Sequence, residues 1–117
     1  MALLSFYCYC IHIFNPTVKD EKKVKLGEEF IVYFISDSYH YPWKFLNKDE
    51  VSDSIELLRR EVVPYLKFAN MEGFKIRAKF NFYFKAIKVT NEAKILKFNY
   101  KETNKNLNYY TIKVNVY

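Results

Sequence analysis

Glycine and cysteine are scarce in this chain, and each scarcity limits what the protein can do. Gly27 and Gly73 are the only glycines among 117 residues, so the glycine-rich loops that hold phosphates in P-loop and dinucleotide-binding proteins are excluded. Cys8 and Cys10 are the only cysteines. The absence of a disulfide framework is compatible with a reducing compartment, and a cytoplasmic location is therefore slightly favoured.

The two cysteines form a Cys-x-Cys motif, which can ligate metal ions. A structural zinc site takes about four ligands, and the only histidines that could complete one are His12 and His40. We therefore interpret Cys8 and Cys10 as small apolar residues of a strand, and we expect no metal ion or other cofactor.

No constellation of catalytic residues is evident. Ser36 or Ser38, together with Asp37 and His40, would supply the residue types of a Ser-His-Asp triad. Neighbours in one loop, however, rarely hold a nucleophile, a base and an orienting carboxylate in a fixed geometry. We therefore expect that the protein is not an enzyme.

Long hydrophobic runs are also absent. The opening run, residues 1–14, is apolar, but it is shorter than the roughly 20 residues that span a bilayer, and it has no basic region at its start. We favour a first strand here and expect no membrane partner. A truncated signal sequence, which would place the protein outside the cell, is the alternative.

Arginine is rare although the chain is basic. The formal net charge is +6, and only three of the nineteen basic residues are arginines, so the side chain best suited to bidentate phosphate recognition is in short supply. One stretch interleaves cations with an aromatic ring, as platforms for single-stranded nucleic acid do, but such platforms stack bases on several rings. We interpret it as the solvent face of a sheet and expect no nucleic-acid partner. Its residues are Lys75, Arg77, Lys79, Tyr83 and Lys85.

What the chain does contain is the alternation typical of strands. Phenylalanine and tyrosine, eleven of each, suit a pleated and half-buried surface. Every second residue from Phe74 to Ala86 is apolar, which predicts a long strand with one aromatic face on a core. Residues 93–101 and the run from Tyr110 to Val116 predict a hairpin. The length is that of a single domain able to bury a core without a metal or disulfides.

The first half of the chain is less regular. Residues 15–25 are polar and predict an exposed connection. A turn or bulge is expected at Gly27, and residues 36–42 are expected to form a loop. The apolar residues between these connections fall on one face of a second strand region: Val24, Leu26, Phe30, Val32 and Phe34.

Residues 47–66 permit two interpretations. A helical spacing of three and four residues would give an α+β domain with a helix at about 48–63; it is shown by Val51, Ile55, Leu58, Val62 and Leu66. The alternative is a strand from Ile55 to Val63 that runs into Pro64. Periodicity alone does not decide between them for so short an apolar run.

From about residue 24 onward the chain resembles the chagasin-like inhibitors of papain-type cysteine proteases. The resemblance implies an all-β, immunoglobulin-like antiparallel β-sandwich, with a strand at Ile55–Val63, over residues 24–117. It rests on five short patterns: Gly27-Glu28-Glu29-Phe30, Tyr41-x-Trp43, Phe84-Lys85-Ala86-x-Lys88, Ile95-x-Lys97-Phe98-x-Tyr100 and Tyr110-x-Ile112-x-Val114-x-Val116.

The resemblance also implies a function and a partner. Members of this family occlude the cleft of a papain-like cysteine protease with three loops and are not cleaved. Leu107 and Tyr109 are expected to anchor the third loop. Carried over by position, the three loops contain Ser38, Tyr39, His40, Tyr41, Pro42 and Trp43, then Asn70, Met71, Glu72 and Gly73, and then Lys101, Glu102, Thr103 and Asn104.

Several loop residues depart from the family pattern. His40 stands where the family has glycine, and residues 101–104 lack the expected arginine, proline and tryptophan. A non-inhibitory sandwich that binds an unknown partner is therefore the alternative function. Trp43 itself has two interpretations, a core residue or a binding surface, and the core is the commoner place for a lone tryptophan. The oligomeric state stays open, since an exposed sheet edge could pair with a second copy.

Overall fold

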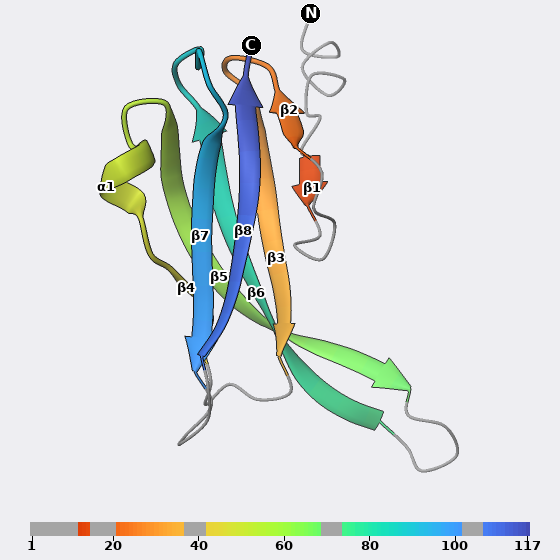
Figure 1. The fold of residues 1–117 in the computed structure, drawn as a ribbon. Coiled ribbons are helices and arrows are strands. Elements are labelled where there is room, and N and C mark those ends of the chain that lie inside the picture. Colours follow the sequence, from red (N-terminus) through yellow and green to blue (C-terminus); the bar gives the residue numbers. More distant parts are fainter. Residues whose placement is uncertain (1–11, 15–20, 37–41, 69–73, 102–106) are drawn as a thin grey trace, which may run out of the picture.

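The computed structural model describes residues 12–14, 21–36, 42–68, 74–101 and 107–117 (Figure 1). Within these ranges the chain is almost entirely strand, with one helical turn. The elements are β1 (His12–Phe14), β2 (Lys22–Val24), β3 (Glu29–Ser36), β4 (Lys44–Phe45), α1 (Lys48–Val51), β5 (Ile55–Phe68), β6 (Phe74–Ala86), β7 (Lys94–Lys101) and β8 (Leu107–Val116).

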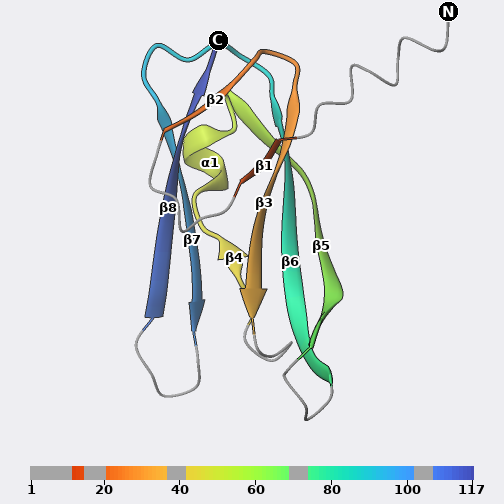
Figure 2. The same ribbon diagram turned by 90° about the vertical axis from the view of Figure 1, so that its right-hand side faces the viewer.

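The strands form two sheets that pack face to face (Figures 1 and 2). Sheet A has the order β1-β3-β6-β5, and sheet B has the order β2-β8-β7-β4. The long pairs β3–β6, β5–β6 and β7–β8 are antiparallel, whereas the three-residue strands β1 and β2 add parallel pairs to β3 and β8. The predicted immunoglobulin-like antiparallel β-sandwich is confirmed.

The alternation in β6 produces the inner face of sheet A. Phe80, Phe82 and Phe84 are at most 1% exposed. In the register with β3 they lie opposite Phe34, Val32 and Phe30, so two rows of apolar side chains face sheet B. Burial of each such side chain contributes about 1.5–3 kcal/mol, which makes this pair of strands the main source of stability in sheet A.

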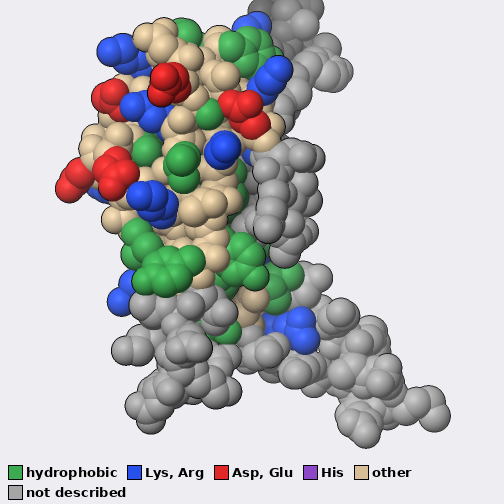
Figure 3. Space-filling model, viewed as in Figure 1, with side chains coloured by type: hydrophobic (Ala, Val, Ile, Leu, Met, Phe, Trp, Pro, Cys, Tyr) green, Lys and Arg blue, Asp and Glu red, His purple; other side chains and the backbone are tan. Residues whose placement is uncertain are grey.

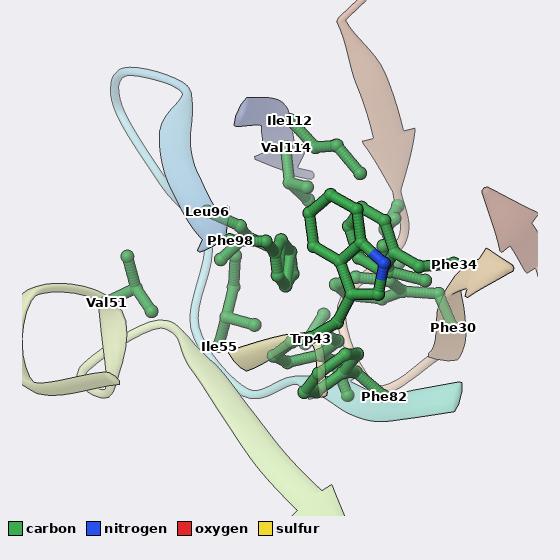
Figure 4. Packing of buried hydrophobic residues seen from close by; sticks show 14 of the residues in the cluster. Phe30, Phe34, Trp43, Val51, Ile55, Phe82, Leu96, Phe98, Ile112 and Val114 are labelled. Atoms are coloured by element: carbon green, nitrogen blue, oxygen red, sulfur yellow. The ribbon is translucent and has the colours of Figure 1, made fainter. Parts of the chain in front are cut away.

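Sheet B supplies the other half of the core. Phe98 of β7 contacts Phe34, Phe82 and Phe84 of sheet A, with ring centroids 5.0, 5.2 and 6.2 Å apart. Leu96 and the alternating residues of β8 complete the layer (Figure 4). The predicted β7–β8 hairpin and its inward face, Ile112, Val114 and Val116, are therefore confirmed.

The alternative prediction of a helix at about 48–63 is wrong, and the strand that the resemblance implies from Ile55 is confirmed. Only Lys48–Val51 is helical, and β5 runs from Ile55 to Phe68 as an antiparallel partner of β6. Leu58 and Val62, which share the helical spacing, are 39% and 36% exposed. Leu58 lies in the bulge between Leu57 and Arg59, and Val62 lies opposite Phe80 on the edge strand of the sheet. β5 also continues through Pro64. It is the edge strand of its sheet, where the missing N–H of proline removes no ladder bond.

The connection predicted over residues 15–25 is partly wrong. Lys22–Val24 forms β2, and Val24 is fully buried. The expected apolar face also fails at Leu26, which is 49% exposed because it lies in the turn beside Gly27. That turn is confirmed: Gly27 has a φ of +90°, a conformation that costs glycine little, and its N–H donates to the carbonyl of Ala86 at 2.8 Å.

The N-terminal run is described only over β1. Cys8 and Cys10 lie outside the described residues, as does the rest of residues 1–11. In the ranges that the structure describes, no helix is both long and apolar enough to cross a membrane.

Asn47 joins β4 and α1 to sheet B. Its side-chain amide donates to the carbonyl of Ile95 at 2.7 Å and accepts from the N–H of Lys97 at 2.9 Å. The backbone N–H of Leu46 donates to the carbonyl of Lys97. The Asn47 side chain therefore extends the hydrogen bonding between β4 and β7 by one more residue. Asn47 is 6% exposed, so water does not readily replace these bonds.

We expect the Asn47→Ala variant to lose about 1–3 kcal/mol of unfolding free energy, because two backbone groups of β7 lose their buried partner. Urea denaturation followed by circular dichroism measures this loss. Asn91→Ala is the matched control, since Asn91 is exposed in the turn before β7 and its replacement should change stability by less than about 0.5 kcal/mol. Equal midpoints for the two variants would contradict the role assigned to Asn47.

Candidate functional site

Three short segments leave and re-enter the sandwich at one end. Residues 37–41 follow β3, residues 69–73 join β5 to β6, and residues 102–106 join β7 to β8. The strand ends that flank all three lie toward the lower end of Figures 1 and 2, where the tip of the β5–β6 hairpin bends away from the ends of β3, β7 and β8. The pairing agrees, because Ser36 lies opposite Ala78 near the start of β6, and Lys44 lies opposite Asn99 near the end of β7.

Most of the predicted binding residues lie outside the described residues. These are Ser38, Tyr39, His40, Tyr41, Asn70, Met71, Glu72, Gly73, Glu102, Thr103 and Asn104. Lys101 is the last residue of β7, and Pro42 is half-buried directly before Trp43. The structure thus describes how the flanking residues are held.

Trp43 is a core residue. It is 4% exposed, and its indole stacks on Phe34 with centroids 4.1 Å apart and planes 17° apart. The rings of Tyr100 and Tyr110 lie 4.7 and 5.3 Å away. Phe34 belongs to sheet A and the two tyrosines belong to sheet B, so Trp43 joins both sheets immediately after residues 37–41 (Figure 4).

The burial of Trp43 changes its expected role at a binding surface. An indole in the core is not available to contact another protein, so its place in the predicted binding set becomes that of an anchor for the preceding segment. This position leaves one donor unpaired, because the indole N–H has no hydrogen-bond partner among the described residues. Packing in the aromatic layer therefore outweighs one unpaired donor.

We expect Trp43→Ala to destabilise the fold by about 3–5 kcal/mol, because it opens a large cavity between the sheets. Trp43→Phe keeps an aromatic ring and should cost less. Circular dichroism during urea unfolding is the measurement, since these variants have no tryptophan fluorescence. An Ala variant as stable as the wild type would show that Trp43 does not join the two sheets.

The strands that flank the second segment extend beyond the strands that flank the other two. β3 ends its pairing with β6 at Ser36 and Ala78, whereas the β5–β6 ladder continues to Phe68 and Phe74. Figure 1 shows this part of the hairpin bending away from the sandwich. Residues 69–73 thus connect strands that project beyond the main body.

The third segment has an exposed aromatic residue beside it. Tyr109 is 62% exposed, so the expectation that it anchors this segment is wrong. Its neighbour Tyr110 faces inward and contacts Phe34 at 6.1 Å. The alternation of β8 explains the difference, since successive side chains of a strand point to opposite faces.

The outer face of sheet A carries its own cation and aromatic pairs. The Lys79 ammonium lies 4.8 Å from the ring centre of Tyr33, and the Arg59 guanidinium lies 3.8 Å from that of Tyr83. The Tyr83 hydroxyl donates to Glu61 at 3.0 Å. A base would have to displace these cations in order to stack on either ring, which favours the interpretation as a solvent face.

A polar cavity of about 420 Å³ lies at the opposite end of the sandwich. An ion pair between Lys94 and Asp53, 3.6 Å long, lies at its wall. No cluster of metal-ligating side chains occurs among the residues that the structure describes. The cavity is lined by Asp53, Ser54, Lys88, Val89, Thr90, Asn91, Glu92, Ala93 and Lys94.

Comparison with known proteins places this arrangement in a known fold. No family model matches the sequence, and no curated protein does. The crystal structure of the cysteine protease inhibitor EhICP2 from Entamoeba histolytica superposes with a TM-score of 0.67 at 17% identity, over 92% of this chain and 96% of that one. The two chains share one fold.

A second solved structure gives the same result. The solution structure of amebosin superposes with a TM-score of 0.57 at 16% identity, over 92% of this chain and 98% of that one. Such coverage includes nearly all of each chain, so the whole sandwich is shared. The fold implied by the resemblance to chagasin-like inhibitors is therefore confirmed.

Proposed function

We propose that this protein is a reversible inhibitor of papain-like cysteine proteases. It occludes the active-site cleft with residues 37–41, 69–73 and 102–106 and with the residues that flank them. The observation that carries the proposal is that all three pairs of flanking strand ends lie toward one end of a sandwich whose fold EhICP2 shares. The binding residues proposed are Ser38, Tyr39, His40, Tyr41, Pro42, Asn70, Met71, Glu72, Gly73, Lys101, Glu102, Thr103 and Asn104, with Trp43 as an anchor.

Occlusion of this kind requires rigid supports and no catalytic group. Segments that are ordered only on binding lose conformational entropy, which weakens the complex. Here the first segment starts at the end of a paired strand and ends at Pro42 and the stacked Trp43. The third is closed by the β7–β8 ladder, whose last pair is Lys101 and Leu107. Both ends of the first and third segments are therefore fixed before binding.

The departures of the loops support a second candidate, a sandwich that binds another partner without inhibiting a protease. His40 replaces the glycine of the family pattern, and residues 101–104 lack its arginine, proline and tryptophan. The scaffold is common to both candidates. Only inhibition distinguishes them.

We expect the purified protein to inhibit papain-like proteases in a titration with a fluorogenic substrate, and to remain intact by mass spectrometry after prolonged incubation. The double variant Tyr39→Ala, His40→Ala should raise the inhibition constant about tenfold or more, since it removes two side chains from the first segment. The double variant Asn91→Ala, Glu92→Ala at the opposite end is the control and should inhibit like the wild type.

Two results would contradict the proposal. The absence of inhibition at micromolar concentration across several papain-like proteases would favour the non-inhibitory binding module. Equal loss of inhibition in both double variants, with both still folded by circular dichroism, would show that the end formed by the three segments is not the binding surface.

A further inference from the structure

A row of outward-facing side chains crosses sheet B directly beside the first and third segments. Lys44 of β4 lies opposite Asn99 of β7, and Asn99 lies opposite Tyr109 of β8. Adjacent strands are about 4.8 Å apart, so the row is about 10 Å wide. Lys44 comes three residues after residue 41, and Tyr109 comes three residues after residue 106.

The next row shows that these three side chains face away from the core. Phe45, Phe98 and Tyr110 are the following residues across the same strands, and they pack into the aromatic layer. Lys44 and Tyr109 consequently point outward and are exposed. Figure 3 shows this face of the molecule, with hydrophobic side chains gathered toward its lower end and most charged ones above them.

Lys44 and Tyr109 have no partner among the described residues, whereas two other outward-facing lysines of sheet B are paired. Lys94 is paired with Asp53, and Lys97 is paired with Glu50 at 3.8 Å. In the part of the chain that the structure describes, the Lys44 ammonium forms no ion pair and the Tyr109 ring makes no ring contact. The row thus offers an apolar ring and a positive charge to another molecule.

The three segments alone contain too few residues for a stable interface with a protease. A stable protein–protein interface takes about 20–30 residues from each partner, whereas the three segments together contain fifteen. Residues beside the segments must therefore contribute. A row that adjoins two of the three segments is in the right place to do so.

We infer that Lys44, Asn99 and Tyr109 form a rim contact with the protease outside its cleft. This inference rests on the proposed function and extends it to the surface that would set the choice of enzyme. Tyr109 lays its ring on apolar surface at the edge of the cleft, since tyrosine is among the residues enriched at protein–protein interfaces. Lys44 approaches a carboxylate on the protease, which raises the association rate more than the final affinity.

The chain offers a matched control for Tyr109. Tyr117 is also 62% exposed, but it follows β8 at its other end, about 26 Å away along the strand. Tyr109→Ala should raise the inhibition constant about tenfold or more against a protease that the wild type inhibits. Tyr117→Ala should leave it unchanged, and Tyr109→Phe should stay within about threefold of the wild type because the ring remains.

A second variant tests the row from another strand. Lys44→Glu should slow association severalfold at low salt, with an effect that fades as salt rises. If circular dichroism shows Tyr109→Ala to be less stable than the wild type, the effect of Lys44→Glu on association decides whether the row contacts the protease. Both side chains are exposed, so stability should change by less than about 0.5 kcal/mol.

The outcomes separate this inference from the proposed function. Inhibition by the wild type with no weakening in Tyr109→Ala and Lys44→Glu would overturn the rim contact and leave the three-segment proposal standing. Equal weakening in Tyr109→Ala and Tyr117→Ala would also overturn it. A wild type that inhibits no papain-like protease would overturn both.

Discussion

The stack of Trp43 on Phe34 is the contact on which the rest of the molecule depends. It lies where the two sheets meet nearest to the three segments, and Tyr100 and Tyr110 close around it from sheet B. Phe34 also contacts Phe98 and Tyr110 of sheet B directly, so the indole fills the space beside an existing contact between the sheets. The aromatic layer formed with Phe82 and Phe98 carries the same constraint through the centre of the sandwich.

At the end of the sandwich opposite the three segments, buried polar side chains connect the strands by hydrogen bonds. The Thr90 hydroxyl accepts from the N–H of Val116 and donates to Asn115, both at 3.0 Å, while the Asn47 amide extends the ladder of β7. Both residues are buried. Their side chains form hydrogen bonds with backbone groups of β7 and β8. Buried polar side chains thus add to the apolar packing at the end far from the candidate site.

The sequence predicted those elements in which one local pattern coincides with one buried face. The phenylalanines of β6 and the alternation of β8 are examples, because a single period of two described both the strand and its burial. β5 was harder to predict, since a bulge after Leu57 shifts the alternation and Pro64 is tolerated only at an edge. β2 depends on pairing with β8, which no local pattern reveals. The candidate site was predicted from the resemblance to a family. The resemblance placed Trp43 beside the first segment but did not predict its burial, which depends on aromatic partners in β3, β7 and β8.

The parallel pair of β2 with β8 has a consequence for how the protein is made. Lys22 lies opposite Val114, and the N–H of Leu26 donates to the carbonyl of Tyr117, so the pair joins residues from nearly opposite ends of the sequence. Contacts this distant are formed late, because the closure of a long loop must come first. On the ribosome, β3, β5 and β6 emerge before β8, and their phenylalanines face water until the last strand arrives. Until β8 packs on it, the aromatic face of sheet A lacks part of its cover, and such exposed apolar surface favours aggregation.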